Sequence, residues 1–371
     1  MKRARWRQRF ATIVAGLLVV LGSVAALMPS GSAGRTHMVN PLPTAAGSGA
    51  WFDYLVLIIM ENHNLCDIWT GCGGTATYMS NLADTYGLAQ AERYCHVNPS
   101  LPNYLCLTGG SDFGCPGYDG NPNSNACTGA AWNAPSIVDR LEAGGLSWKA
   151  YAEDMPSACY GTNAGLYAVR HNPFVYYNSI AGNGTRCARV VPAGTSGNVL
   201  IGDLQSTTTA SRYMWLSPNT CNDMHDGGAN CGVSHGDAYL STLVPQILNS
   251  TIFTTTRAAL LITFDEGYGQ PVYTVWAGPT ARRAFTSTVA YDHFSILATI
   301  EANWNLTRLT SNDVAASTMN EFFLAGSPRV PAPQGPSVLL FFEISSIVVI
   351  ALVAAGLLVS RRRKRERNPP P

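Results

Sequence analysis

The most constraining feature of the sequence is an uninterrupted apolar run, Tyr54–Met60, that ends abruptly at Glu61-Asn62-His63-Asn64. The run contains β-branched residues and shows no alternation of polar and apolar positions. A run this short is typical of a strand that is buried on both faces of a parallel sheet. Because ligands bind beyond the carboxyl ends of strands in open α/β sheets, the polar residues that follow are the first place to look for a site. The alternative is that Glu61 and Asn62 only cap the next turn.

A second apolar run, Ala258–Phe264, has the same character and ends at Asp265-Glu266-Gly267. Around these two runs, short apolar segments alternate with segments of helical spacing and with loops rich in Gly and Pro. This alternation predicts one doubly wound α/β domain with a mostly parallel sheet. Further strands are expected at 147–152, 212–216 and 271–277, and helices at 75–86, 135–143, 238–248 and 292–304. Asp237 is expected to cap the helix that starts at 238.

Both ends of the chain have the composition of membrane-targeting segments. Residues 1–33 combine a basic start, an apolar run and small residues, which predicts a secretory signal peptide, with an uncleaved anchor as the alternative. Residues 337–360 are long and apolar enough for a transmembrane helix, and the basic residues 361–371 are expected in the cytoplasm. The remaining divisions are a linker at 34–49, a folded domain at 50–325 and a Pro-rich stalk at 326–336. The folded domain is therefore expected outside the cytoplasm.

The ten cysteines support an oxidising compartment, since all of them lie inside the folded domain and their number is even. Short spacings favour the local pairs Cys66 with Cys72, Cys115 with Cys127, and Cys221 with Cys231. Structural zinc is the competing interpretation, but the sequence has no paired C-x2-C set.

Charge and motif content exclude several functions. The net charge is +1, and with the basic tails set aside the body is mildly acidic, which argues against a nucleic-acid-binding surface. The sequence has no G-x-S-x-G elbow, no Walker loop and no strand-linked G-x-G-x-x-G. A serine triad of the α/β-hydrolase type and a nucleotide-binding loop are therefore not supported.

Two pairs of polar residues, which together carry three carboxylates and one amide, follow the two most strand-like runs. Glu61-Asn62 and Asp265-Glu266 would meet at one edge of the sheet if the two strands are neighbours. Hard oxygen ligands that gather in this way suit a divalent metal ion, and without a cation their mutual repulsion would raise some of their pKa values.

Ser100 is the best candidate for a nucleophile, because it precedes Leu-Pro-Asn-Tyr104, which has the pattern of a first helical turn. A serine there lies at the positive end of the helix dipole, where free N–H groups can also hold a phosphoryl oxygen. The alternative is that Ser100 is only an N-cap. His171, His225 and His293 lie in polar loops or at a helix start, with Asp223 beside His225. These histidines suit phosphate binding, proton donation or metal ligation.

Six short motifs, taken together and in this order, resemble the phosphoesterase family of bacterial acid phosphatases and phospholipases C, within the alkaline phosphatase superfamily. The motifs are Met60-Glu-Asn62, Pro99-Ser-Leu-Pro-Asn-Tyr104, His171-Asn-Pro-Phe174, Pro218-Asn-x-Cys-Asn-Asp-Met-His-Asp226, Phe264-Asp-Glu-Gly267 and His293-Phe-Ser-Ile-Leu297. The resemblance covers roughly 50–325 and implies a three-layer α/β/α sandwich that hydrolyses phosphate esters with a divalent metal.

The resemblance also implies a role for each matched residue. The metal ligands of the family correspond to Glu61, Asn62, Asp265 and Glu266. Its nucleophile corresponds to Ser100, which would form a phosphoserine, and Asn103 matches a residue that helps to hold the phosphoryl oxygens. The phosphate-binding and proton-donating histidines correspond to His225 and His293, with His171 as a further substrate contact. Asp223 is assigned to substrate binding. The acid phosphatase branch implies one metal ion, and a second metal site made of Asp223, His225 and His293 stays open.

Three alternatives remain at this point. A sulfatase is disfavoured because Tyr104 stands where the sulfatase signature has arginine. A phosphotransferase would use the same intermediate with a different acceptor. A non-catalytic surface-binding protein on this scaffold would be expected to have lost some of the site residues, and all are present. Monoester, diester and phospholipid substrates are not distinguished by the sequence.

Overall fold

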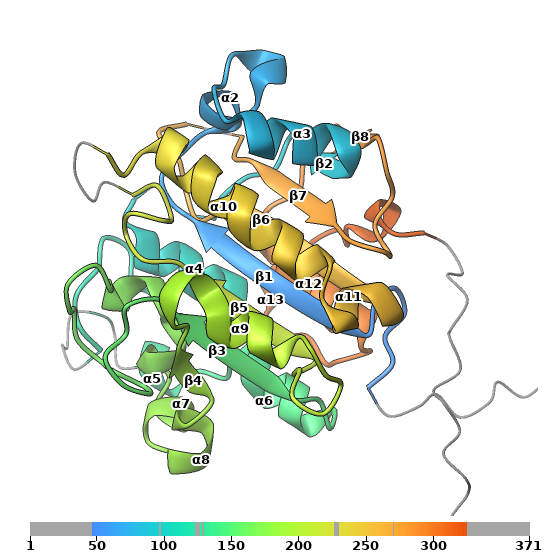
Figure 1. Ribbon diagram of the computed structural model, residues 1–371. Coiled ribbons are helices and arrows are strands. Elements are labelled where there is room, and N and C mark those ends of the chain that lie inside the picture. The colour runs from blue at the N-terminus through green and yellow to red at the C-terminus, as the bar shows by residue number, and fades with distance from the viewer. Residues whose placement is uncertain are drawn as a thin grey trace, which may run out of the picture. The chain divides into compact units, whose positions relative to one another are not determined.

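The apolar run Tyr54–Met60 forms strand β1, and all its residues are buried. The other strands are β2 (Gly87–Ala89), β3 (Trp148–Ala152), β4 (Val190–Pro192), β5 (Tyr213–Ser217), β6 (Ala258–Phe264), β7 (Thr274–Ala277) and β8 (Phe285–Ser287). In the described part of the chain they form an eight-stranded sheet in the order β4-β3-β5-β1-β6-β7-β2-β8 (Figure 1). Every pairing is parallel except those of β7 with β6 and with β2. The predicted mostly parallel sheet is confirmed.

The structure is a computed structural model that describes residues 47–324, apart from 96–97, 123–126, 128–129, 226–229 and 270. The predicted signal peptide, stalk, transmembrane segment and basic tail lie outside the described residues, as does most of the linker. Among the helices that are described, none has the length and apolar character needed to cross a bilayer.

The register between β1 and β6 sets the positions of the polar pairs Glu61-Asn62 and Asp265-Glu266. The strands are parallel and aligned along their whole length, so that Met60 lies opposite Phe264. The ladder extends one step further, since the Asp265 N–H donates to the Met60 carbonyl (2.9 Å). Glu61 and Asp265 therefore leave the sheet at the same edge. The sequence predicted both strands with the bounds that the structure has.

Helices lie on both faces of the sheet. They are α2 (Leu65–Ile68), α3 (Thr77–Thr85), α4 (Ser100–Gly109), α5 (Ala130–Asn133), α6 (Ile137–Ala143), α7 (Asn178–Ala181), α8 (Gly184–Cys187), α9 (Asn198–Asp203), α10 (Val233–Leu248), α11 (Thr251–Thr255), α12 (His293–Asn303) and α13 (Ser311–Ala315). α10 packs against α3 and α11, whereas α12 packs against α4, α6 and α13. Figure 1 shows α10 in front of the sheet and α4 behind it.

The predicted start of α10 was wrong. The helix begins at Val233 rather than at 238, so Asp237 lies inside its first turns. The Asp237 carboxylate instead accepts hydrogen bonds from the N–H groups of Tyr78 (3.0 Å) and Met79 (2.8 Å) at the start of α3. The N-cap residue of α3 is Ala76, which has no side-chain acceptor. A carboxylate from a neighbouring helix therefore accepts the hydrogen bonds that an N-cap side chain would otherwise accept.

Replacing Asp237 by alanine is expected to lower the free energy of unfolding by about 1–2 kcal/mol, because two N–H groups at the positive end of α3 lose their acceptor. Thermal unfolding followed by circular dichroism measures the loss. The matched control is Gln246→Ala on the exposed side of the same helix. Equal melting temperatures for the two variants would show that Asp237 does not stabilise α3.

Five disulfides close loops around the sheet, and no cysteine of the chain is free. Three of them are the predicted local pairs, Cys66–Cys72, Cys115–Cys127 and Cys221–Cys231. The other two, Cys95–Cys106 and Cys159–Cys187, join residues that the spacing did not single out. Cys95–Cys106 joins the segment before Ser100 to the middle of α4, so Ser100 lies inside the closed loop.

Candidate active site

The carboxylates that follow β1, β5 and β6 converge at one edge of the sheet. Glu61 and Asp265 are fully buried, and Asp223 and Glu266 are nearly so. Asp223 lies in the turn after β5, where its carbonyl accepts a hydrogen bond from the Glu61 N–H (2.9 Å). Four acids in so small a buried volume are costly unless a cation or protons neutralise them.

Ser100 lies against this group of carboxylates. It is the first residue of α4, and its hydroxyl donates to Glu61 Oε2 (3.0 Å). The interpretation of Ser100 as a simple N-cap is wrong, because Pro99 holds the N-cap position. The N-terminal end of α4 thus places a hydroxyl, with the positive end of the helix dipole behind it, at the carboxylate cluster.

A buried chain of polar side chains runs from Tyr104 to Asp223. The Tyr104 hydroxyl donates to Glu61 Oε1 (2.5 Å), and His171 Nε2 lies 3.1 Å from the same oxygen. On its other side, His171 Nδ1 lies 3.0 Å from Asp223 Oδ2. Asp223 Oδ1 accepts a hydrogen bond from the His225 N–H (2.8 Å). The Tyr104 and His171 rings are parallel, with centroids 5.6 Å apart, which fixes the orientation of the imidazole.

Burial decides the protonation of this chain. Burial first, and then repulsion from Asp265 and Asp223, raises the pKa of the Glu61 carboxyl well above its ordinary value. Burial likewise raises the pKa of Asp223 and lowers the pKa of His171. Without a cation, burial therefore favours the neutral form of both carboxyl groups and of the imidazole.

The second acidic pair is held by main-chain and amide donors. Asp265 Oδ1 accepts from the N–H groups of Asn62 (3.3 Å) and Glu266 (2.6 Å). Glu266 Oε2 accepts from the Asn98 N–H (2.6 Å) and from Asn103 Nδ2 (3.2 Å). Burial raises the pKa of Asp265 to about 7 and the pKa of Glu266 to about 8. Both carboxyls would ionise more readily with a cation beside them.

The residues present fit a divalent cation. The ligand atoms of Glu61, His171 and His225 lie within 4.8 Å of one another. Asp265 Oδ2 is buried and accepts no hydrogen bond, and His171 Nε2 is not aligned for one although Glu61 is near. Buried oxygen and nitrogen atoms that have no hydrogen-bond partner and lie around a carboxylate cluster are suited to bind a metal ion.

The predicted metal ligands share only Glu61 with the group of Glu61, His171 and His225. The structure brings Glu61, Asp265 and Glu266 to the same edge, and Asn62 participates through its main-chain N–H to Asp265. The backbone of Asn62 has a positive φ of 55°, which turns the chain sharply just after Glu61. The assignment of Glu61, Asn62, Asp265 and Glu266 as the ligands stays a prediction.

The remaining predicted residues lie around this centre. Asn103 is buried one turn into α4 and contacts Glu266 as described. His293 is buried at the start of α12, where its Nε2 lies 3.1 Å from the Phe264 carbonyl and burial lowers its pKa to about 4. Its Nδ1 is buried without a hydrogen-bond partner. The roles of His171, His225 and His293 in substrate binding or proton transfer stay predictions.

Sequence reasoning missed three side chains of the site. Tyr104 was noted only as the residue that replaces the sulfatase arginine. Arg170 was not considered, although it directly precedes His171, and its guanidinium contacts His225 Nε2 (3.1 Å). Arginine only donates, so His225 Nε2 is the acceptor in this contact. Asp119, which lies in an irregular loop, contacts Arg170 Nε (3.0 Å). No periodic signal marks a loop residue of this kind.

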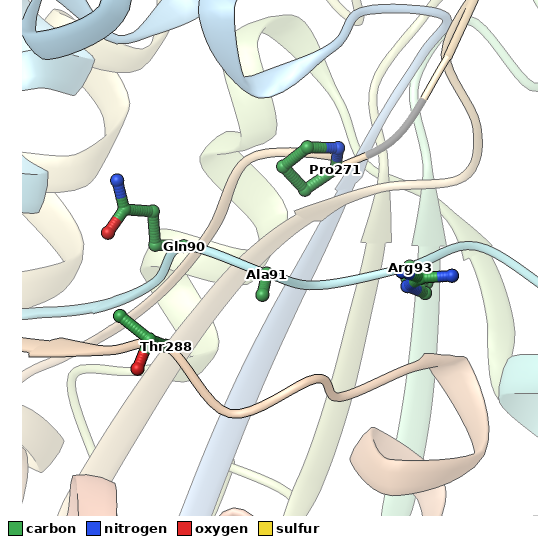
Figure 2. A pocket seen from close by; sticks show the side chains of 5 residues that line it. All are labelled: Gln90, Ala91, Arg93, Pro271 and Thr288. Atoms are coloured by element: carbon green, nitrogen blue, oxygen red, sulfur yellow. The ribbon is translucent and has the colours of Figure 1, made fainter.

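A separate cavity of about 330 Å³ is lined by Gln90, Ala91, Arg93, Pro271 and Thr288. Figure 2 shows Gln90, Ala91 and Arg93 along one extended segment, with Pro271 on the segment across from it. None of the residues of the carboxylate cluster lines this cavity. This cavity is therefore separate from the cluster around Ser100.

A serine at a helix start, set against buried carboxylates and histidines at the edge of an α/β sheet, defines an ester hydrolase that has a polar, cation-compatible centre. The model of the phosphoesterase family matches residues 73–307, and the chain belongs to this family. The family resemblance seen in the motifs is therefore confirmed, and the protein is a phosphoric ester hydrolase. The matched segment contains Ser100, Asp265 and the histidines, whereas Glu61 and Asn62 precede it.

Named relatives agree with this class. A phosphate-repressible acid phosphatase from Penicillium chrysogenum is 28% identical over 300 residues, which are 77% of this chain and 67% of that protein. A phosphatidylinositol-3-phosphatase from Mycobacterium tuberculosis is 26% identical over 293 residues, which are 78% of this chain and 88% of that protein. A solved structure from Vibrio parahaemolyticus, described as a protein in the alkaline phosphatase superfamily, has a TM-score of 0.49 and 12% identity, with 72% of this chain and 69% of that chain covered.

Proposed function

We propose that this protein is a metal-dependent phosphomonoesterase that acts through a phosphoserine at Ser100 and is anchored outside the cytoplasm. The observation that carries the proposal is the contact of 3.0 Å between the Ser100 hydroxyl and Glu61, inside a cluster of buried acids at the N-terminal end of α4. A serine that only stabilised the fold would not need three further carboxyl groups around it. The names of the relatives, acid phosphatase and phosphatidylinositol-3-phosphatase, support a monoester substrate.

The residues of the chain divide the work of the reaction. A divalent cation held by Glu61, Asn62, Asp265 and Glu266 would offset charge on the phosphoryl oxygens and lower the pKa of the serine hydroxyl. Glu61 orients Ser100 Oγ and takes its proton at Oε2, the atom that already accepts the hydrogen bond of this hydroxyl. Ser100 Oγ then forms a bond to phosphorus as the bond to the leaving oxygen breaks.

A histidine, for which His225 is the candidate, gives its proton to the leaving oxygen. Water then attacks the phosphoserine and gives a proton back to the histidine. The bond between Ser100 Oγ and phosphorus breaks, Ser100 recovers its proton from Glu61, and phosphate is released. The side chain of Asn103 is close enough to Glu266 to stabilise a phosphoryl oxygen beside the cation, and a preorganised donor of this kind contributes on the order of 3 kcal/mol to the transition state.

The location of the protein is part of the proposal. The signal-like residues 1–33 and the apolar residues 337–360 would export the domain and hold it at the outer face of the membrane. The five disulfides support an oxidising compartment, where such bonds persist. A membrane-anchored phosphomonoesterase would release phosphate from esters outside the cytoplasm.

The test is an assay of the full-length protein on three substrates: an aryl phosphomonoester, an aryl phosphodiester and a phospholipid, each with and without a chelator. We expect hydrolysis of the monoester to dominate and to be lost after metal removal. Faster cleavage of the diester or the phospholipid would contradict the choice of monoester, and activity that is indifferent to metal removal would contradict the metal site.

A phosphotransferase differs only in the acceptor. Adding an alcohol to the monoester assay distinguishes the two, because transfer would produce a new phosphate ester in place of free phosphate. We expect free phosphate to be the main product.

A further inference from the structure

Asp119 joins the main-chain N–H that follows the nucleophile to an arginine that contacts His225. Its Oδ1 accepts a hydrogen bond from the Leu101 N–H (3.0 Å), which is the amide directly after Ser100. Its Oδ2 lies 3.0 Å from Arg170 Nε. One carboxylate therefore holds a main-chain donor at the start of α4 and the guanidinium of the arginine that precedes His171.

These two donors have the chemistry of a phosphoryl-oxygen subsite. The Leu101 N–H lies at the positive end of a ten-residue buried helix, and such ends bind anions. Arg170 offers planar donors that match the oxygens of a phosphoryl group. The same guanidinium reaches His225, the candidate proton donor, and its charge acts on Glu61 and Asp223. Arg170 thus contacts both His225 and the carboxylate that holds the Leu101 N–H.

We propose that the Leu101 N–H and the Arg170 guanidinium bind the phosphoryl oxygens, and that the Asp119 carboxylate occupies this subsite until a phosphate ligand replaces it. The inference rests on the proposed function, since it assigns a subsite for the same reaction. Asp119 is a competing internal anion rather than a catalytic residue, and Arg170 is a substrate-binding residue.

The setting of Asp119 allows the exchange. Its side chain is 32% exposed, whereas Arg170 is 20% exposed and Leu101 is fully buried. The backbone around Asp119 is fixed on both sides, by the Cys115–Cys127 disulfide and by the Tyr176 hydroxyl, which donates to the Gly120 carbonyl (2.7 Å). Rotation of the Asp119 side chain toward solvent frees both donors without movement of the loop.

The inference has a consequence for turnover. A phosphate ligand must displace a carboxylate that already accepts a hydrogen bond from the Leu101 N–H and lies 3.0 Å from Arg170 Nε. Binding of phosphate is weakened by this competition, and the return of Asp119 assists the release of the phosphate product. The Kd for the phosphate product would be higher than it would be without the competing Asp119 carboxylate.

The experiment measures equilibrium binding of inorganic phosphate to the full-length, metal-loaded protein by calorimetry at about pH 7.5. We expect Asp119→Asn to lower the Kd for phosphate about tenfold, because asparagine keeps the shape without the competing charge. Asp119→Ala should act in the same direction. Arg170→Gln should raise the Kd about tenfold or more, and Arg170→Lys should recover part of the loss.

Two variants with the same change of charge serve as controls. Asp84→Asn lies on an exposed position of α3, and Arg186→Gln lies on α8, where Arg186 pairs with Asp139 and Glu142. Both controls should bind phosphate within about twofold of the unchanged protein. Thermal unfolding of every variant checks that the fold is kept.

The outcomes separate this inference from the proposed function. A Kd that is unchanged or higher in both Asp119 variants would overturn the competition, and an unchanged Kd in Arg170→Gln would overturn the subsite. Either result leaves the phosphatase activity of the unchanged protein as it was measured. Absence of that activity, in contrast, would overturn the proposed function while the binding data still decide the role of Asp119.

Discussion

Replacing Ser100 by alanine is expected to lower kcat for an aryl phosphomonoester by a factor of about 10⁴ or more, since the variant lacks the oxygen that forms the phosphoserine. The side chain lost is small, and its hydroxyl donates a hydrogen bond to Glu61. The remaining carboxylates and α4 keep their positions, so binding of inorganic phosphate should change little. Steady-state kinetics measures the first effect, and calorimetry measures the second.

The matched control is Ser241→Ala, at an exposed position of α10. Its kcat should equal that of the unchanged protein, and the melting temperatures of both variants should stay within a few degrees of it. A Ser100→Ala variant that retains more than about a tenth of the activity would remove Ser100 from the role of nucleophile.

Removal of the metal is expected to make stability fall as the pH rises from about 6.5 to about 8.5. The folded-state pKa of Asp265 is raised to about 7 and that of Glu266 to about 8 by burial, above the ordinary values near 4 in the unfolded chain. A carboxyl whose pKa is raised on folding contributes its stability below the unfolded pKa and loses it as the pH passes the folded pKa. The metal-free protein should therefore melt at a lower temperature at the higher pH, by on the order of 5 °C or more.

A bound divalent cation should reverse this trend, because it favours the ionised carboxylates that the metal-free fold disfavours. The double variant Asp265→Asn, Glu266→Gln is the control, since it removes these two groups and should show a smaller pH dependence. Glu301, whose pKa burial also raises to about 8, titrates in the same range in both proteins and does not affect the comparison. The chosen range lies above the pKa of about 4 of His293, so that imidazole stays neutral throughout. A chelated protein that melts at the same or a higher temperature at about pH 8.5 would contradict the prediction.

The central part of the fold was predictable because it depends on local patterns. Tyr54–Met60 and Ala258–Phe264 are continuous apolar runs, and seven such residues in a row, rich in β-branched side chains, are typical of a strand buried on both faces. Polar residues that end both runs had to meet once the strands were neighbours. The short cysteine spacings identified three disulfides, with sequence separations of 6, 12 and 10. Spacing alone did not identify Cys95–Cys106, although its separation of 11 is equally short.

Contacts between distant segments were not predictable from the sequence. Asp237 has the residue type of a helix cap and was assigned to its own helix, whereas it caps α3 across a helix–helix contact. The chain from Tyr104 through His171 to Asp223 joins three segments that share no spacing rule. Asp119 illustrates the same limit, because its contacts with the Leu101 N–H and with Arg170 depend on how distant segments pack together.

The Cys95–Cys106 disulfide has a practical consequence for anyone who prepares this protein. Because the bond encloses Ser100, material made in a reducing bacterial cytosol would carry its nucleophile on an untethered segment even where the sheet has formed. A well-folded but inactive preparation would then report on the expression host rather than on the enzyme. Export to an oxidising compartment, or refolding with a thiol–disulfide couple, is therefore a condition for any assay of this chain.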